Sequence, residues 1–289
     1  MATAIVTPFH QDGSINYDSL KNLIEFQIKS GVDAIVVCGT TGEASTLSYT
    51  EHLRVTEFCC EMVNGRIPVI AGSGSNDTAH AVEQSKKCCE IGVDGLLVVT
   101  PYYNKTSQDG LISHYFEIAD ASSKPIMLYN VPSRTGMNVL PQTYKRLSEH
   151  ENIVAVKEAG GNISSIAKTA MLCKEDLWIY SGNDDQIVPI LSLGGQGVIS
   201  VLSNILPDAV SKICKHFFNG EVQKSADLQI KYFDLVEAVF CDVNPMPIKY
   251  ALNAMGFEVG ECRLPLTDLS TANRALVSAT LKKYNMIEN

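Results

Sequence analysis

The sequence is poor in several features that mark whole classes of protein. Charged residues make up only 19% of its 289 residues, and 23 lysines and arginines face 32 aspartates and glutamates, for a formal net charge of −9. A protein that holds nucleic acid on a basic face is therefore not expected. No apolar run approaches the roughly 20 residues that a membrane-spanning helix needs. The first residues, Met1–Val6, predict a strand and not a signal peptide.

Several signatures of metal and nucleotide sites are also missing. The chain contains no CxxC pair and its six histidines are dispersed, so a structural zinc site is not expected. It has no GxxxxGK[ST], HExxH or GxSxG motif, and Gly72–Asp77 lacks the third glycine of a dinucleotide-binding loop. The nine cysteines are scattered and no secretory signal is found, which predicts free thiols in a reducing cytoplasm.

Hydrophobic residues, at 45% of the chain, follow two alternating patterns. Short apolar runs bounded by Gly or Pro predict eight buried parallel strands. These are Ala4–Thr7, Ala34–Val37, Pro68–Ala71, Gly95–Thr100, Ile126–Asn130, Ile153–Lys157, Leu177–Ser181 and Gly197–Val201. Between them, apolar residues recur at i, i+3, i+4 and i+7, as in the segment from Val55 to Met62, which predicts helices that cover a sheet. Ser48 with Glu51, Asn162 and Pro207 give helix-start signals.

Eight strands, each followed by a helix, favour a closed (β/α)8 TIM barrel over an open doubly wound sheet. After Gly220 no further strand is expected. Three apolar stripes there predict helices, over Leu228–Val239, Ile248–Met255 and Leu269–Leu276, the second ended by Gly256. The sequence thus predicts an α/β protein, with a barrel carrying the active site over residues 1–220 and an all-helical C-terminal domain over residues 221–289.

Ligands of a parallel barrel gather at the carboxyl ends of its strands. Lys157 ends one strand and, by alternation, shares a face with Ile153 and Ala155, while Glu158 points the other way. If that face is the barrel interior, desolvation favours the uncharged amine, which condenses with a carbonyl to form a Schiff base. When Lys157 is considered by itself, the same pattern fits an ordinary lysine at a strand end whose side chain extends to water.

Other strand ends add hydroxyl and cationic groups. Arg134 follows a turn and is suited to clamping a carboxylate, although an exposed loop arginine fits equally well. Tyr129 lies at a strand end, where its hydroxyl is free to donate or accept a hydrogen bond; an ordinary core tyrosine fits equally well. Thr40 and Thr41 offer hydroxyls and N–H groups to an anion, or form a tight turn. Tyr103 adjoins another tyrosine, Tyr102, and the two are not expected to lie in one core.

Together these segments resemble the dihydrodipicolinate synthase family of the pyruvate-dependent class I aldolases, over nearly the whole chain. The resemblance rests on six segments: Gly39–Glu43, Pro101–Lys105, Tyr129–Gly136, Val156–Ala159, Ser181–Asp184 and Gly197–Val201. It implies a (β/α)8 barrel with a C-terminal helical domain and no metal or organic cofactor. It also implies small-molecule substrates, no nucleic-acid or membrane partner, and a homotetramer built as a dimer of dimers.

The resemblance further implies a lyase reaction. Lys157 would form the Schiff base with pyruvate, and Tyr129, Thr40 and Tyr103 would form a proton relay, with Tyr103 crossing from a neighbouring subunit. The enamine would condense with L-aspartate 4-semialdehyde. The product would be 4-hydroxy-tetrahydrodipicolinate, the first committed intermediate toward diaminopimelate and lysine.

Four further residues would bind the substrates. Thr41 would hold the pyruvate carboxylate, and Arg134 would receive the semialdehyde near its carboxylate. Gly182 and the carbonyl of Ile199 would shape the pocket around the lysine.

Two alternatives stay open. The first is a sister enzyme on the same scaffold, an N-acetylneuraminate lyase or a keto-deoxy sugar acid aldolase, although such relatives usually lack the equivalent of Arg134. The second is a non-catalytic binding or regulatory relative, because fold alone does not establish activity. Three positions depart from common family patterns. Ala44 stands where many relatives carry serine, and Tyr49 and His80 depart from the pattern of lysine-inhibited relatives, which predicts weak or absent inhibition by lysine.

Overall fold

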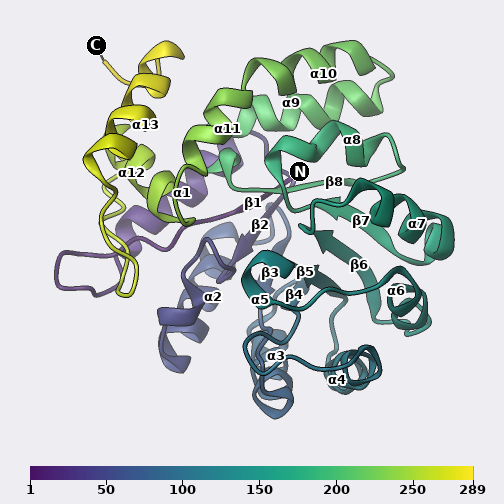
Figure 1. The fold of residues 1–289 in the computed structure, drawn as a ribbon. Coiled ribbons are helices and arrows are strands. Elements are labelled where there is room, and N and C mark those ends of the chain that lie inside the picture. Colours follow the sequence, from purple (N-terminus) through teal and green to yellow (C-terminus); the bar gives the residue numbers. More distant parts are fainter. Residues whose placement is uncertain (289) are drawn as a thin grey trace. The chain divides into compact units, whose positions relative to one another are not determined.

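The structure, a computed structural model, describes residues 1–288. Eight parallel strands form a closed barrel in the order β1 to β8, which confirms the predicted fold class (Figure 1). The strands are β1 (Ala2–Ala4), β2 (Ala34–Val37), β3 (Val69–Gly72), β4 (Gly95–Val99), β5 (Ile126–Asn130), β6 (Ile153–Glu158), β7 (Trp178–Ser181) and β8 (Gly197–Ser200). Each predicted strand overlaps one of these.

The first strand is the least accurate of the predictions. Its ladder with β2 covers Ala2–Ala4, whereas the sequence predicted Ala4–Thr7. Beyond Ala4 the N–H of Ile5 still donates to the carbonyl of Val36 at 3.0 Å, and the N–H of Val6, which points to the other side of the strand, donates to Asn204 Oδ1 at 3.2 Å. A side chain from outside the sheet therefore binds the N–H of Val6.

Helices and short 3-10 turns separate the strands. The α-helices that accompany the barrel are α1 (Tyr17–Lys29), α2 (Tyr49–Val63), α3 (Thr78–Ile91), α4 (Gln108–Ala121), α5 (Pro132–Thr135), α6 (Pro141–Leu147), α7 (Ile163–Cys173), α8 (Ile187–Leu191) and α9 (Pro207–Phe218). The 3-10 turns are η1 (Ala44–Thr46), η2 (Lys174–Asp176), η3 (Asp184–Gln186) and η4 (Leu202–Asn204). The predicted start signals are confirmed: Ser48 and Glu51 form a capping box, Asn162 caps α7, and Pro207 opens α9.

The C-terminal region is helical, as predicted. It contains α10 (Val222–Lys231), α11 (Phe233–Val239), α12 (Met246–Ala254) and α13 (Thr271–Lys283). The single stripe predicted over Leu228–Val239 is split between α10 and α11 at Tyr232, which has φ −102° and ψ 13°. The ring of Tyr232 packs at 5.2 Å from that of Tyr284. The domain boundary after residue 220 stays a prediction.

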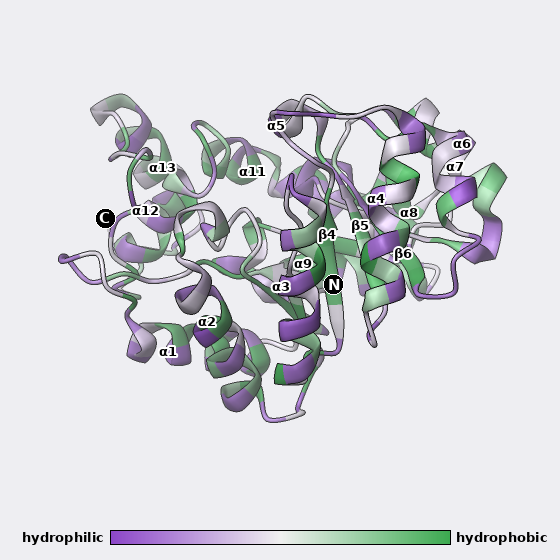
Figure 2. Ribbon diagram, turned by 90° about the horizontal axis from the view of Figure 1, so that it is seen from below, coloured by the Kyte–Doolittle hydropathy of each residue, from purple (hydrophilic) through white to green (hydrophobic). Residues whose placement is uncertain are grey.

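The chain forms two compact units, Met1–Ile67 with Ser200–Asn289, and Pro68–Ile199. The second unit holds β3 to β7, with α3, α4, α6 and α7 around them in Figure 1. Figure 2 shows β4 in the hydrophobic colour and α3 in bands of both colours, as expected for a buried strand and an amphipathic helix. Within residues 1–288, no helix has both the length and the apolar character to cross a membrane.

Candidate active site

Lys157 lies in a row of register partners on β5, β6, β7 and β8, and all of these partners belong to Pro68–Ile199. Tyr129 on β5 pairs with Lys157 on β6, Lys157 with Tyr180 on β7, and Tyr180 with Gly197 on β8. Because paired residues of parallel strands share a face, these side chains project from one side of the sheet. The sequence analysis did not single out Tyr180, although the same alternation would have placed it beside the lysine.

The amine of Lys157 is enclosed. Lys157 is 5% exposed and Tyr129 is 7% exposed, and the Nζ atom lies 4.4 Å from the centroid of the Tyr129 ring. The ring face is a favourable neighbour for a cation and an apolar wall for a neutral amine. A buried lysine and a strand-end tyrosine therefore lie against each other on neighbouring strands.

Gly182 lies directly against the lysine stem. A Cβ at this position would lie 2.8 Å from Ala159 Cβ and 3.1 Å from both Cγ and Cε of Lys157. A larger residue here would crowd Ala159 and the stem of Lys157, so the glycine keeps room for the lysine side chain. Ile199 follows two residues after Gly197 on β8 and is 1% exposed.

Arg134 and Tyr103 come from the loops after β5 and β4. Arg134 is exposed and lies in α5, a single helical turn that begins at Pro132 and ends at Gly136, where φ is +68°. Tyr103 is 91% exposed and has a left-handed φ of +69°, whereas Tyr102 is 38% exposed. The expectation that the two tyrosines do not share one core is confirmed.

A network that the sequence analysis missed lies behind the lysine, around the Glu158 carboxylate. Tyr144 Oη donates to Glu158 Oε2 at 2.8 Å, Asn130 Nδ2 donates to Oε1 at 2.9 Å, and the Gly160 N–H donates to Oε1 at 2.7 Å. Glu158 is 7% exposed. Burial raises the pKa of Glu158, and the hydrogen bonds from Tyr144, Gly160 and Asn130 oppose that rise.

The same network reaches the segment that follows Arg134. Asn130 Nδ2 also donates to Asn138 Oδ1 at 2.9 Å, and Asn130 Oδ1 accepts from the N–H of Val139 at 3.1 Å. Asn130 is the register partner of Glu158, one residue beyond the pair of Tyr129 and Lys157. Asn130 and Glu158 thus link β5 to β6 by hydrogen bonds, next to the pair of Tyr129 and Lys157.

Thr40 and Thr41 belong to the first unit, in the loop after β2. Thr40 is half-buried and Thr41 is 2% exposed. Asn244 Nδ2 donates to Thr41 Oγ1 at 3.0 Å, and Thr7 Oγ1 donates to the carbonyl of Gly42 at 2.7 Å. The threonine loop is therefore held by side chains of its own unit.

Two further features concern residues that could bind a metal ion and the cysteine thiols. Within residues 1–288 no three side chains of His, Cys, Asp or Glu are grouped so that they could hold a metal ion. All nine cysteines are free thiols. Two adjacent pairs lie in helices, Cys59 and Cys60 in α2 and Cys88 and Cys89 in α3.

Comparisons with known proteins agree on one family. The model of the dihydrodipicolinate synthetase family matches residues 1–284. A 4-hydroxy-tetrahydrodipicolinate synthase from Caldicellulosiruptor bescii is 56% identical over 283 residues, which cover 98% of this chain and 96% of the relative. One from Acetivibrio thermocellus is 52% identical over 284 residues, with 98% and 96% covered.

A solved structure gives the same result. The dihydrodipicolinate synthase from Aquifex aeolicus matches with a TM-score of 0.97 at 41% identity, covering 100% of this chain and 99% of that one. Matches of this identity and coverage concern the whole chain and not a shared fold alone. The chain belongs to the dihydrodipicolinate synthetase family.

Proposed function

We propose that this chain condenses pyruvate with L-aspartate 4-semialdehyde to give 4-hydroxy-tetrahydrodipicolinate, a lyase reaction that opens diaminopimelate and lysine biosynthesis. The observation that carries the proposal is the buried amine of Lys157 against the Tyr129 ring, 4.4 Å from its centroid, in a chain 56% identical to a relative named for this reaction. A lysine amine is the group that condenses with a carbonyl to form a Schiff base.

The amine of Lys157 forms a bond to the substrate in the first step and is released in the last. Lys157 attacks the keto carbon of pyruvate, water leaves, and the resulting protonated imine draws electrons from the methyl group. Loss of a methyl proton gives an enamine, whose carbon attacks the aldehyde carbon while the aldehyde oxygen takes up a proton. The amine of the semialdehyde then displaces Lys157 from the imine carbon, which closes the ring and frees the lysine.

Protons must move at each step, and hydroxyl groups supply the route. The Tyr129 ring lies against the lysine amine, and we assign the relay to Tyr129, to Thr40 and to Tyr103 of a neighbouring subunit. General acid–base help of this kind contributes typically about 10²–10⁴-fold. The 91% exposure of Tyr103 supports this assignment, because its ring is not packed within its own chain.

The remaining site residues bind the two carboxylate substrates. We assign the pyruvate carboxylate to Thr41 and the semialdehyde carboxylate to Arg134, whose guanidinium can donate two parallel hydrogen bonds. Gly182 leaves room for the lysine stem, and the carbonyl of Ile199 is assigned to the wall of the pocket. No organic cofactor or metal takes part in these steps.

We further propose a homotetramer built as a dimer of dimers, located in the cytoplasm. The exposed Tyr103 supports the first point, since its proposed role needs a second subunit. Nine free thiols support the second, because thiols persist in a reducing compartment.

One experiment tests the reaction. The protein is incubated with pyruvate, quenched with borohydride and digested, and the peptide that contains Lys157 is weighed. A reduced pyruvate adduct on that peptide, absent in Lys157→Ala, is expected, together with turnover of pyruvate and the semialdehyde. An unmodified peptide would refute the Schiff base. Preferential turnover of sialic acid or keto-deoxy gluconate would favour a sister aldolase, and trapping without any turnover would favour a non-catalytic relative.

A further inference from the structure

Lys249 is a fully buried lysine that the proposed reaction does not use. It lies in α12 and is 1% exposed. Its Nζ atom donates to Glu43 Oε1 at 2.9 Å and to the carbonyls of Thr7 at 3.1 Å and Glu261 at 2.8 Å. An ammonium group has three N–H donors, so each of them has an acceptor. The Nζ atom also lies 4.3 Å from the centroid of the Phe9 ring.

The partner of this lysine, Glu43, lies in the threonine loop, which is the loop after β2 over residues 39–46. The backbone of Glu43 has a left-handed φ of +54°, which residues other than glycine rarely adopt. Its second oxygen, Oε2, accepts from the N–H of Arg263 at 2.9 Å. Both carboxylate oxygens are thus held by the C-terminal region, across 206 and 220 residues of sequence. Strained backbone persists only where its surroundings fix it, and here the fixing groups are visible.

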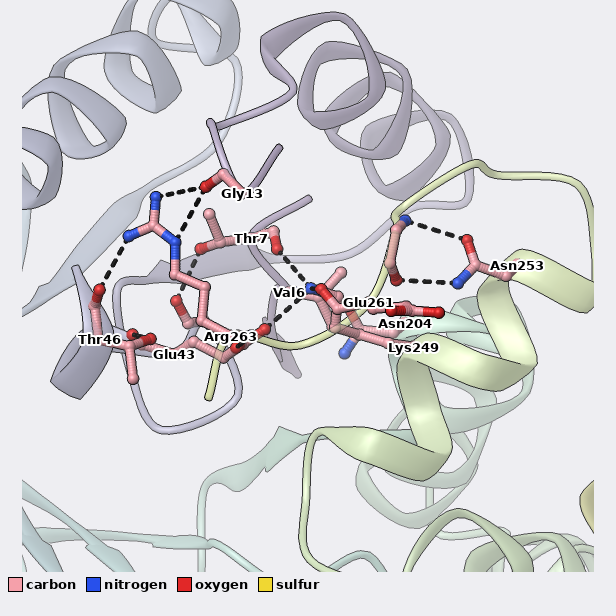
Figure 3. A network of polar contacts seen from close by, with 12 residues as sticks. Val6, Thr7, Gly13, Glu43, Thr46, Asn204, Lys249, Asn253, Glu261 and Arg263 are labelled. Carbon is pink, nitrogen blue, oxygen red and sulfur yellow. Dashed lines mark hydrogen bonds and ion pairs between the residues drawn. The ribbon is translucent and has the colours of Figure 1, made fainter. Parts of the chain in front are cut away.

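Arg263 extends the same network to the far side of the loop. Its guanidinium donates to the carbonyls of Gly13 and Thr46 at 2.7 and 2.8 Å (Figure 3). It also donates to the Glu51 carboxylate at 2.6 and 2.9 Å. Figure 3 shows Glu43 in the same network, with Lys249 reaching it from α12. Glu43 and Thr46 of the threonine loop are therefore bound to Lys249 and Arg263.

The threonine within the loop receives a third contact. Asn244 lies two residues before α12, and its Nδ2 donates to Thr41 Oγ1 at 3.0 Å. A hydroxyl has one donor and two acceptor positions. When an amide N–H occupies an acceptor position, the hydroxyl proton points away from Asn244 and is available to another acceptor, such as a carboxylate.

A buried ion pair adds little stability compared with well-packed apolar residues, because desolvation of two charges is costly. We propose that the loop clamp, defined as Glu43, Asn244 and Lys249, fixes the threonine loop so that Thr41 donates its hydroxyl proton to the pyruvate carboxylate. The three are positioning residues, and this inference rests on the proposed function. The C-terminal helical region thereby becomes part of the construction of the pyruvate site.

The first test removes the ion pair without leaving a lone buried charge. The double variant Glu43→Gln/Lys249→Met keeps similar volumes and removes both charges together. Its folding is checked by circular dichroism and thermal melting. We expect KM for pyruvate to rise about tenfold or more, since a hydrogen bond to a charged group is worth that factor in affinity. KM for the semialdehyde and the borohydride adduct at saturating pyruvate should change less than about threefold.

Ile248→Val is the matched control. Ile248 adjoins Lys249 in α12 and is 0% exposed, so the change loosens packing of the same helix and touches none of the clamp contacts. A rise in KM for pyruvate equal to that of the double variant would overturn the inference, because general loosening of α12 would then explain both. An unchanged KM in a folded double variant would overturn it too.

A second pair of variants tests the direction of the hydroxyl, even if the double variant does not fold. Asn244→Asp replaces the donor by an acceptor, which draws the Thr41 proton away from pyruvate, whereas Asn244→Ala removes the contact. We expect KM for pyruvate to rise several-fold more in Asn244→Asp than in Asn244→Ala. Equal values would overturn the inference. Pyruvate trapping on Lys157 in the unaltered protein is measured alongside, so that failure of the clamp is distinguished from failure of the proposed reaction.

Discussion

The hydrogen bond from Tyr144 to Glu158 gives a prediction whose size follows from the structure. Tyr144→Phe removes one oxygen from a ring that is 1% exposed and leaves the packing of the ring unchanged. The lost bond, 2.8 Å long, donates to a buried carboxylate. Hydrogen bonds to charged groups contribute about 1.5–3 kcal/mol. The free energy of unfolding at neutral pH should fall by that amount, with a decrease of several degrees in Tm.

The loss of unfolding free energy in Tyr144→Phe should be smaller at acid pH than at neutral pH. Burial raises the pKa of Glu158, so the fold favours its protonated form, and this contribution to stability is present at low pH and is lost as pH rises through the folded-state pKa. Tyr144 opposes the rise, so Tyr144→Phe should raise the pKa of Glu158 further. Toward acid pH the lost bond is one between neutral groups, worth about 0.5–1.5 kcal/mol. The variant should therefore be penalised less at pH 5 than at pH 7.5.

Urea unfolding of both proteins at the two pH values measures the effect. Tyr115→Phe is the matched control, because Tyr115 is 0% exposed and its hydroxyl donates to a neutral carbonyl, that of Val98, at 3.2 Å. Its penalty should be about 0.5–1.5 kcal/mol and equal at both pH values. The reasoning fails if Tyr144→Phe costs no more than Tyr115→Phe at pH 7.5, or costs the same at pH 5.

Three further predictions concern the site and the thiols. Arg134→Ala should raise KM for the semialdehyde about tenfold or more and KM for pyruvate by less than threefold, as steady-state kinetics would show; equal increases would remove the assigned role. Lysine should not inhibit half-maximally below about 1 mM in the same assay, because Tyr49 and His80 depart from the pattern of inhibited relatives; submillimolar inhibition would contradict this. Burial raises the pKa of Cys38 to about 12, so iodoacetamide at pH 8 should leave Cys38 unmodified in the native protein and modify it in urea, as read by mass spectrometry.

Local patterns were sufficient to predict the barrel. The alternation of Ile153, Ala155 and Lys157 predicted that they share one face of a strand, and all three are buried in β6. The capping box at Ser48 was readable because it is also formed by residues close in sequence. Tyr180 is the register partner of Lys157 on β7. Alternation along β7 would have placed Tyr180 on the same face as the lysine once the two strands were known to be neighbours.

The polar networks could not be predicted in the same way. Glu158 is bound by Tyr144, which lies on a separate helix, and Glu43 is bound by Lys249, 206 residues away. Neither partner has a sequence pattern that distinguishes it from an ordinary core tyrosine or surface lysine. Such contacts depend on tertiary packing, as does the bond from the N–H of Val6 to Asn204 beyond the end of β1.

The distance in sequence between Glu43 and its two partners has a consequence for how the protein is made. A ribosome adds about 5–20 residues per second, so the 220 residues that separate Glu43 from Arg263 emerge roughly 10–45 s after it. Until Lys249 and Arg263 have been synthesised, the carboxylate lacks the counter-ion and the backbone donor that bind it in the folded protein. The loop that carries the threonines therefore takes its working shape among the last events of translation, long after its own strand has been synthesised.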